Sequence, residues 1–291
     1  MTSPEQENYR SRQFEASAHR RFWWHQRGHA HYVPPVYGTL TNDEWAVLEE
    51  WFKETERLEL VGEMQIPFVS VLQALVLGSG MTRIVQLGHY SGYSSLLLGF
   101  YLRRIGHPAR LVSIDIAGDM TEFSRTWIAR AGLDDYVQLV TGDSASSDSR
   151  DTALRLLGDR QPQLVIVDSS HQYAQSLLEL DLWYPVIEPY GLLVAHDISA
   201  FASQYDITGL GGGKRAFDEW CSRNGAPHLA INGDYSGKAS GAPIYFDGCG
   251  LGLVYKPAES TARRTCPSRI TGVVRHFWLR ATNRWAPRAT G

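Results

Sequence analysis

The sequence predicts an α/β fold in which an N-terminal helical cap precedes a doubly wound, mostly parallel sheet of seven strands. Three observations lead to this fold class. Five short runs are apolar at nearly every position, which is typical of strands covered on both faces. These runs recur about every 25 to 30 residues, which leaves room for a helical crossover each time. After a helix near residues 215–222, two further candidate strands bring the total to seven.

The predicted elements follow one another along the chain. The helix of the cap begins at Thr41 or Asn42, which are good N-cap residues, and its apolar residues recur every three or four positions. A second apolar stretch, IPFVSVLQALVLGSG, predicts another helix that ends at its glycines. The candidate strands then cover residues 83–87, 110–116, 136–140, 163–167, 191–195, 228–232 and 250–256.

The 291 residues divide into three zones by composition. We expect an aromatic and histidine-rich segment with the helical cap over 1–81, a core over 82–257 and a basic tail over 258–291. The net charge of −3 excludes a chain-wide electrostatic footprint for nucleic acid. The apolar runs are shorter than the roughly 18 to 20 residues that span a bilayer, and the polar N-terminus does not resemble a signal peptide.

The cysteines, and the histidines near the N-terminus, do not follow the spacing of a zinc site. The three cysteines are odd in number and widely spaced, which favours a reducing compartment and no zinc module. The N-terminal histidines do not follow a recognised zinc spacing; they are His19, His25, His29 and His31. We therefore expect a cytoplasmic protein that binds neither membrane nor nucleic acid.

A glycine-containing turn follows the first predicted strand. Gly88 and Gly92 separate that strand from the apolar helix SSLLLGFYL. Glycines permit a tight turn and a close backbone approach, and the start of a helix offers unpaired amides to an anion. The spacing is not the dinucleotide fingerprint, and no Lys-Ser/Thr follows as in a Walker loop. A plain structural turn explains this segment equally well when it is taken alone.

The next two strand ends favour a nucleoside site. Asp115 lies at the tip of the second strand, where an acid can accept hydrogen bonds from both ribose hydroxyls. The third run is followed by Gly142, Asp143 and Ser144, a polar group where an adenine edge would lie. The carboxyl ends of parallel strands share one edge of the sheet, so these residues indicate a crevice along that edge.

Taken together, the motifs VQLGHYSGYSS, Asp115, GDS at 142–144, VDSSH and AHD resemble a class I S-adenosylmethionine-dependent methyltransferase. The pattern is most similar to small O-methyltransferases of the catechol and caffeoyl-CoA type and to bacterial natural-product enzymes. The resemblance covers about residues 60 to 257 and implies a Rossmann-like sheet.

The resemblance also implies how the cofactor is held. Gly88, Tyr90 and Ser94 would bind the methionine portion, with Gly92 in the same turn. Asp115 would bind the ribose, and Asp143 with Ser144 would lie near the adenine. The family usually has an acid where this chain has Gln86, whose amide can still form a hydrogen bond to the cofactor's amino group.

The fourth and fifth strand ends carry candidate catalytic residues. Asp168 and Asp197 are short oxygen donors that suit a hard divalent cation such as magnesium. His196 occupies a position that resembles a metal ligand of the family, although imidazole suits zinc, iron or manganese at least as well. His171 lies where catechol-type relatives place a catalytic lysine, and a neutral histidine can take a proton near pH 7.

These residues also have simpler interpretations. Asp168 could cap the following helix, and His171 could be a satisfied polar residue in a loop. His89 and His196 compete with His171 for the role of base. Two loops could border the site: Thr208 to Arg215 after the fifth strand, and the insert over 232–250, which could line the entrance.

The sequence thus predicts transfer of a methyl group from S-adenosylmethionine to a hydroxyl of a small molecule, with assistance from a divalent metal, most simply magnesium. We expect the acceptor to be a secondary metabolite and the protein to be a homodimer or higher homo-oligomer. One alternative keeps the fold and changes the reaction, as in hydroxylase-like proteins and cyclases. The other is a non-catalytic partner.

Overall fold

The computed structural model describes residues 33–60, 62–231 and 247–258. The described residues up to Pro257 belong to one compact unit. The N-terminal histidines, the segment 232–246 of the insert and the basic tail from residue 259 lie outside the described residues. No helix within the described ranges is long and apolar enough to cross a membrane.

Seven strands form one sheet within the described residues, and the predicted fold class is confirmed. The strand order is β3-β2-β1-β4-β5-β7-β6. The first five strands pair in parallel, whereas β7 is antiparallel to both β5 and β6. The strands are β1 (Arg83–Leu87), β2 (Arg110–Asp115), β3 (Val137–Thr141), β4 (Leu164–Val167), β5 (Leu192–His196), β6 (His228–Ile231) and β7 (Leu251–Tyr255).

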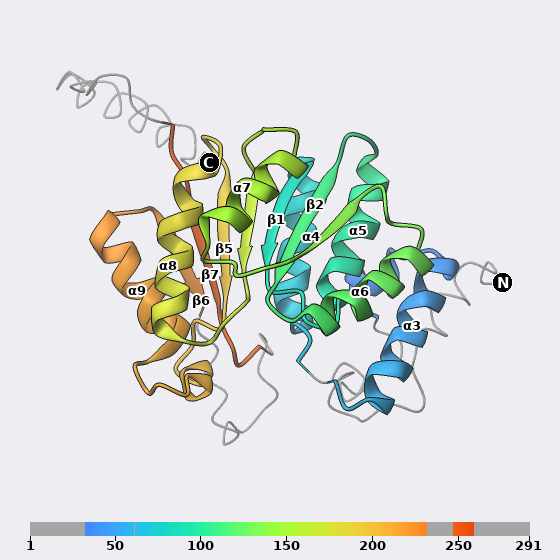
Figure 1. The fold of residues 1–291 in the computed structure, drawn as a ribbon, viewed down its shortest axis with the longest axis horizontal. Helices are drawn as coiled ribbons and strands as arrows, with labels where there is room; N and C mark the ends of the chain where they lie inside the picture. Colours follow the sequence, from blue (N-terminus) through green and yellow to red (C-terminus); the bar gives the residue numbers. More distant parts are fainter. Residues whose placement is uncertain (1–32, 61, 232–246, 259–291) are drawn as a thin grey trace, which may run out of the picture. The chain divides into compact units, whose positions relative to one another are not determined.

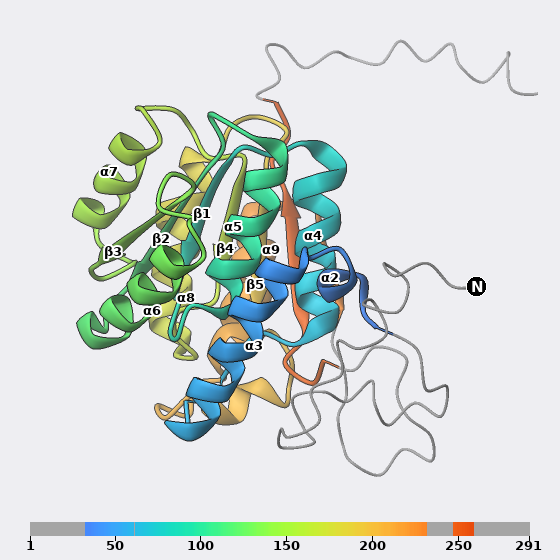
Figure 2. The same ribbon diagram turned by 90° about the vertical axis from the view of Figure 1, so that its right-hand side faces the viewer.

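Helices cover both faces of the sheet (Figures 1 and 2). One hydrophobic cluster joins one sheet face to α4 (Ile66–Ser79), α5 (Tyr93–Ile105) and α6 (Gly118–Arg130). The other joins the opposite face to α7 (Ser147–Leu156), α8 (Tyr173–Trp183) and α9 (Gly212–Asn224). Ile84 and Val85 illustrate the alternation, since these neighbours on β1 belong to different clusters. The apolar runs are continuous because both faces of the strands are buried.

The cap packs against α5. It contains α2 (Pro35–Gly38) and α3 (Asn42–Arg57), and Thr41 forms a capping box with Glu44 at the start of α3. Glu44 is buried and pairs with Arg103 and Arg104 near the end of α5. Residues 62–66 connect the cap to α4. They pass along the edge of the sheet that the carboxyl ends of the parallel strands form.

The predicted boundaries of six of the seven strands shift by one residue, and one shift changes the site. The second strand ends at Asp115 rather than at Ile116, because the Asp115 carboxylate accepts the Ala117 amide and turns the chain. The fifth strand extends to His196, which pairs with Leu251 of β7. His196 is therefore part of the sheet. Two short 3-10 helices complete the description, Tyr184–Val186 and Ala202–Tyr205.

Candidate functional site

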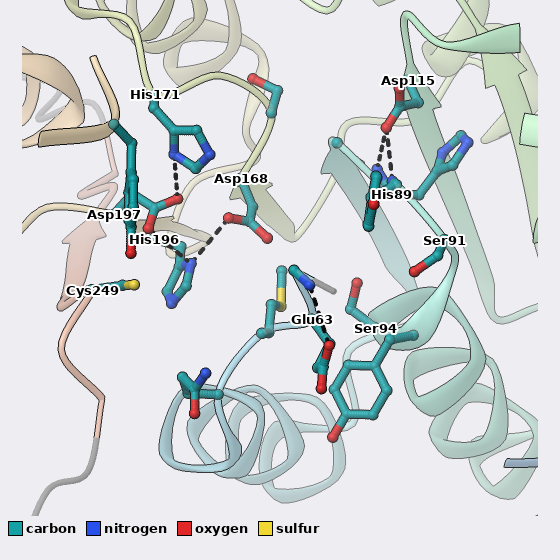
Figure 3. Close-up of a pocket in the computed structure, with 18 of the residues that line it drawn as sticks. Glu63, His89, Ser91, Ser94, Asp115, Asp168, His171, His196, Asp197 and Cys249 are labelled. Atoms are coloured by element: carbon teal, nitrogen blue, oxygen red, sulfur yellow. Dashed lines mark hydrogen bonds and ion pairs between the residues drawn. The ribbon is translucent and has the colours of Figure 1, made fainter. Parts of the chain in front are cut away.

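A cavity of about 690 Å³ opens at the carboxyl ends of β1, β2, β4 and β5 (Figure 3). Residues 62–66 and Tyr37 of the cap close its other side. This volume lies in the usual range for small-molecule sites. Among the described lining residues are eight of the predicted site residues: Gly88, Tyr90, Ser94, Asp115, Asp168, His171, His196 and Asp197.

The turn after β1 requires its glycines. Gly88 has φ +84°, and a Cβ there would lie 2.1 Å from the carbonyl oxygen of Asp168. Gly92 has φ +90° and precedes α5; a Cβ there would meet the Ser124 hydroxyl at 2.8 Å. Backbone of the β4 loop and a side chain of α6 therefore approach this turn closely, which only glycine permits.

Asp115 holds the same turn in place. Its Oδ2 accepts the amides of His89 at 2.9 Å and Tyr90 at 2.8 Å, and its Oδ1 accepts the Ala117 amide at 2.9 Å. A carboxylate offers about four acceptor positions, of which these amides occupy three, and Asp115 lines the cavity. Asp115 can thus accept a ligand hydroxyl while it organises the loop.

Gln86 is buried and directed into the turn. Its Nε2 donates to the carbonyl of Gly88 at 2.7 Å and to the Ser94 hydroxyl at 2.6 Å, and its Oε1 accepts from Ser95. Gln86 is not among the described residues that line the cavity. Its amide therefore braces the turn, and a direct contact to a cofactor stays a prediction.

His89 is a buried, neutral histidine. Nδ1 lies 3.2 Å from the Ser113 hydroxyl and Nε2 lies 3.0 Å from the Thr121 hydroxyl. Burial, outweighing the attraction of Asp115, lowers the pKa of His89 to about 4. Because both ring nitrogens are engaged, the structure does not favour His89 as a base.

The end of β3 is held by α8. Asp143 accepts from Gln175 at 2.9 Å, and Ser144 donates to Glu179. Neither Asp143 nor Ser144 is among the described residues that line the cavity, so the adenine contact stays a prediction.

Glu179 is a buried acid behind the site that the sequence analysis did not single out. Its Oε1 accepts from the hydroxyls of Ser144 after β3 and Ser169 after β4, whereas Oε2 is buried without a hydrogen-bond partner among the described residues. Burial raises the pKa of Glu179 to about 7. The signal in the sequence is an acid within the apolar run LLELDLW. This carboxyl joins the loop after β3 to the loop after β4.

We expect Glu179→Gln to remove a pH dependence of stability. The folded pKa of about 7 exceeds the ordinary 4.5, so the wild type loses stability as the pH rises between these values. At roughly 1.36 kcal/mol per pKa unit, the loss is on the order of 3 kcal/mol. Urea unfolding at pH 5 and pH 8 measures it, with exposed Glu122→Gln as the control. An equal slope in wild type and Glu179→Gln would contradict the assignment.

Four side chains converge at the ends of β4 and β5 (Figure 3). His196 Nδ1 lies 3.0 Å from Asp168 Oδ1 and 3.6 Å from Asp197 Oδ1. His171 Nδ1 lies 2.9 Å from Asp197 Oδ2. Asp197 has φ +58°, a strained conformation for a non-glycine residue of the kind found at functional sites.

The electrostatics of this cluster follow from burial and pairing. Burial disfavours a charge on His196, but Asp197 and Asp168 outweigh it and hold the pKa of His196 well above its ordinary value. Burial alone would raise the pKa of Asp197, yet His196 and His171 hold it below the usual range. The hydrogen bond that His171 donates to Asp197 raises the pKa of His171, whose side chain is 49% exposed. His196 is enclosed, whereas His171 is accessible from the cavity.

Two further residues that the sequence analysis did not single out come from the segment before β7. Asp247 Oδ2 lies 3.5 Å from His196 Nε2. Cys249 lines the cavity, and burial raises the pKa of its thiol. The sequence analysis expected the insert over 232–250 to line the entrance, but it did not single out these two residues, because the pairing of β7 with β5 brings them beside His196.

The side chains of Asp168, His196 and Asp197 are of the types that bind metal ions. Metal–ligand distances of about 2.0 to 2.2 Å place neighbouring ligand atoms about 3.0 to 3.6 Å apart. The separations of His196 Nδ1 from the two carboxylate oxygens, 3.0 and 3.6 Å, match this spacing. The 3.0 Å separation is also that of a hydrogen bond between His196 and Asp168, so metal binding by these residues stays a prediction.

Comparisons with known proteins agree with the fold. Residues 85–198 match the model of a family described as methyltransferase domain. An O-methyltransferase from Bacillus cereus, solved with S-adenosylhomocysteine, is similar at TM-score 0.55 and 17% identity over 72% of this chain and 90% of that chain. A search of curated proteins finds no match.

Two further structures are similar. The O-methyltransferase TomG from Streptomyces achromogenes, involved in tomaymycin synthesis and solved with S-adenosylmethionine, has TM-score 0.55 and 16% identity over 88% of this chain and all of that chain. The methyltransferase PaMTH1 from Podospora anserina, bound to S-adenosylhomocysteine, has TM-score 0.53 and 16% identity over 75% of this chain and 89% of that chain. Residues 85–198 thus match a methyltransferase domain, and the similarity of the chain to these solved structures is one of fold.

Proposed function

We propose that the protein transfers a methyl group from S-adenosylmethionine to a hydroxyl oxygen of a small molecule. One observation carries the proposal: a single cavity contains both the glycine turn after β1 and an Asp197–His171 pair. The first feature suits the cofactor, and the second suits removal of a proton from the acceptor.

The turn after β1 and the end of β2 would bind the cofactor. Gly88 lets the ligand approach the backbone, and Ser94 at the start of α5 lines the same side. Asp115 accepts a ribose hydroxyl at its remaining acceptor position. When bound, S-adenosylmethionine supplies a reactive sulfonium methyl group, so the protein's task is to orient an oxygen in line with it.

His171 is the residue that we assign as general base. Asp197 Oδ2 lies 2.9 Å from Nδ1 and fixes the ring, which leaves Nε2 for the acceptor hydroxyl. In its neutral form His171 would take the acceptor's hydroxyl proton at Nε2; the cofactor, when bound, would supply the methyl group and leave as S-adenosylhomocysteine. Asp197 stabilises the resulting imidazolium, as the acid does in an Asp–His pair.

Asp168, His196 and Asp197 would hold a divalent ion. Such an ion lowers the pKa of a bound hydroxyl and helps to orient it. Oδ1 of Asp197 faces His196, and Oδ2 faces His171, so one carboxylate can serve both the ion and the base.

Calorimetry with S-adenosylmethionine, with and without EDTA, tests the cofactor site. We expect binding in both conditions, because the cofactor contacts come from β1 and β2. Asp115→Asn should weaken binding about 10- to 100-fold, since it removes a charged acceptor. Asp119→Asn, an exposed change on α6, is the control. Failure of the wild type to bind would overturn the proposed function.

The finer predictions rest on the resemblance and on composition. They are a secondary-metabolite acceptor, a homodimeric or larger assembly, and a cytoplasmic location. Binding of the cofactor without methyl transfer would instead favour a repurposed fold.

A further inference from the structure

We propose that the ends of β4 and β5 bind a borderline transition-metal dication such as Zn²⁺, with Cys249 as a ligand and Asp247 orienting His196. The inference deepens the proposed function and rests on it for the position of the ion. It names two residues of the segment before β7 and replaces magnesium as the expected metal.

The segment 247–249 is fixed against the end of β5. Asp247 Oδ1 accepts the Cys249 amide at 2.9 Å, which folds the turn between them. The Ser199 amide donates to the Cys249 carbonyl at 2.9 Å, and the Ser199 hydroxyl donates to the carbonyl of Gly248. Gly250 follows with φ +83°, and a Cβ there would meet Ser199 at 3.1 Å. Hydrogen bonds to the backbone of Cys249 therefore hold its thiol in position.

Three ligand-type groups meet beside this segment. Cys249 Sγ, a nitrogen of His196 and a carboxylate oxygen of Asp197 all lie within 4.8 Å of one another. Around a zinc ion, with bonds of about 2.0 to 2.3 Å, tetrahedral ligand atoms lie roughly 3.3 to 3.8 Å apart. The upper limit of 4.8 Å exceeds this spacing by about 1 Å, so the ligand atoms would draw together when an ion binds.

The chemistry of these donors selects the ion. Magnesium prefers oxygen ligands in near-ideal octahedral geometry and keeps several waters. Thiolate and imidazole favour zinc and similar ions. Binding replaces the thiol proton: the S–H bond breaks, a sulfur–metal bond forms, and one proton passes to solvent.

His196 provides an independent observation. Its side chain is only 7% exposed, and Nε2 has no hydrogen-bond partner among the described residues. Asp247 Oδ2 lies 3.5 Å from this nitrogen, while Nδ1 faces Asp168 and Asp197. A histidine that binds a metal through one nitrogen usually donates the other N–H to a carboxylate, which fixes the ring. Asp247 occupies that place and is a positioning residue.

Cobalt titration of the full-length, EDTA-treated protein tests the inference. Co²⁺ reports a thiolate ligand through a near-ultraviolet charge-transfer band. We expect the band in wild type and its loss in Cys249→Ser. Cys221→Ser, in the core of α9, and Cys266→Ser, outside the described residues, should keep it. Zn²⁺ should displace Co²⁺, whereas a large excess of Mg²⁺ should not.

Asp247→Asn separates positioning from ligation. We expect Co²⁺ affinity to fall about 10- to 100-fold, with the band retained at saturation. A band that persists in Cys249→Ser, displacement of Co²⁺ by Mg²⁺, or no Co²⁺ binding would overturn the inference. Calorimetry with S-adenosylmethionine on the same samples reports the cofactor site and folding separately. Normal cofactor binding beside a failed cobalt result would leave the proposed function standing.

Discussion

His171→Ala is expected to lower kcat about 10²- to 10⁴-fold, the range that a positioned general base contributes. The affinity for S-adenosylmethionine should stay unchanged, because the expected cofactor contacts come from the loops after β1 and β2. The His171 side chain is 49% exposed, so added imidazole can enter the space that the substitution leaves. We expect imidazole to restore part of the activity. Steady-state kinetics with and without imidazole measure both effects.

His89→Ala distinguishes a chemical role from a structural one. His89 is buried between the Ser113 and Thr121 hydroxyls, so its loss should lower stability, and imidazole should not restore the activity of this variant. Unchanged turnover in His171→Ala, with normal cofactor binding, would remove His171 as the base.

Gly88→Ala is expected to abolish cofactor binding and to cost more than roughly 3 kcal/mol of unfolding free energy. The φ of +84° alone costs a non-glycine residue about 1 to 2 kcal/mol. The added Cβ would also lie 2.1 Å from the Asp168 carbonyl oxygen, which forces the β1 and β4 loops apart. Urea unfolding and calorimetry measure the two effects.

Gly80→Ala is the matched control. Gly80 ends α4 with φ +64°, and a Cβ there meets nothing within 4 Å among the described residues. The control should therefore lose only about 1 to 2 kcal/mol and keep cofactor binding. If the two variants lost the same stability, the close approach of the two loops would be wrong.

The apolar runs in the sequence predicted the sheet well, because a strand that is buried on both faces has a continuous apolar sequence. The run 83–87 coincides with β1. The ends of the strands are less predictable, since they depend on single hydrogen bonds such as that from Ala117 to Asp115.

The direction of a buried side chain was harder to predict. Gln86 lies on β1 as expected, but its amide is engaged by Gly88 and Ser94 of its own turn. Glu179 was missed because its partners are Ser144 and Ser169, which follow different strands.

The site at the ends of β4 and β5 was predicted only in part. The pairing of Asp197 with His171 joins two motifs that the sequence had marked as candidates. Asp247 and Cys249 come from a turn about 50 residues beyond His196, which reaches the site because β7 pairs with β5. Such long-range contacts leave no local pattern in the sequence.

Methyl transfer from ¹³C-methyl S-adenosylmethionine tests the central claim most directly. The protein is incubated with the labelled cofactor and a panel of phenols, catechols and other small hydroxylated compounds, and the products are read by ¹³C NMR and mass spectrometry. We predict a labelled O-methyl product, strongly reduced in His171→Ala. Cofactor binding without a methylated product across the panel, or label on nitrogen or carbon, would contradict the account.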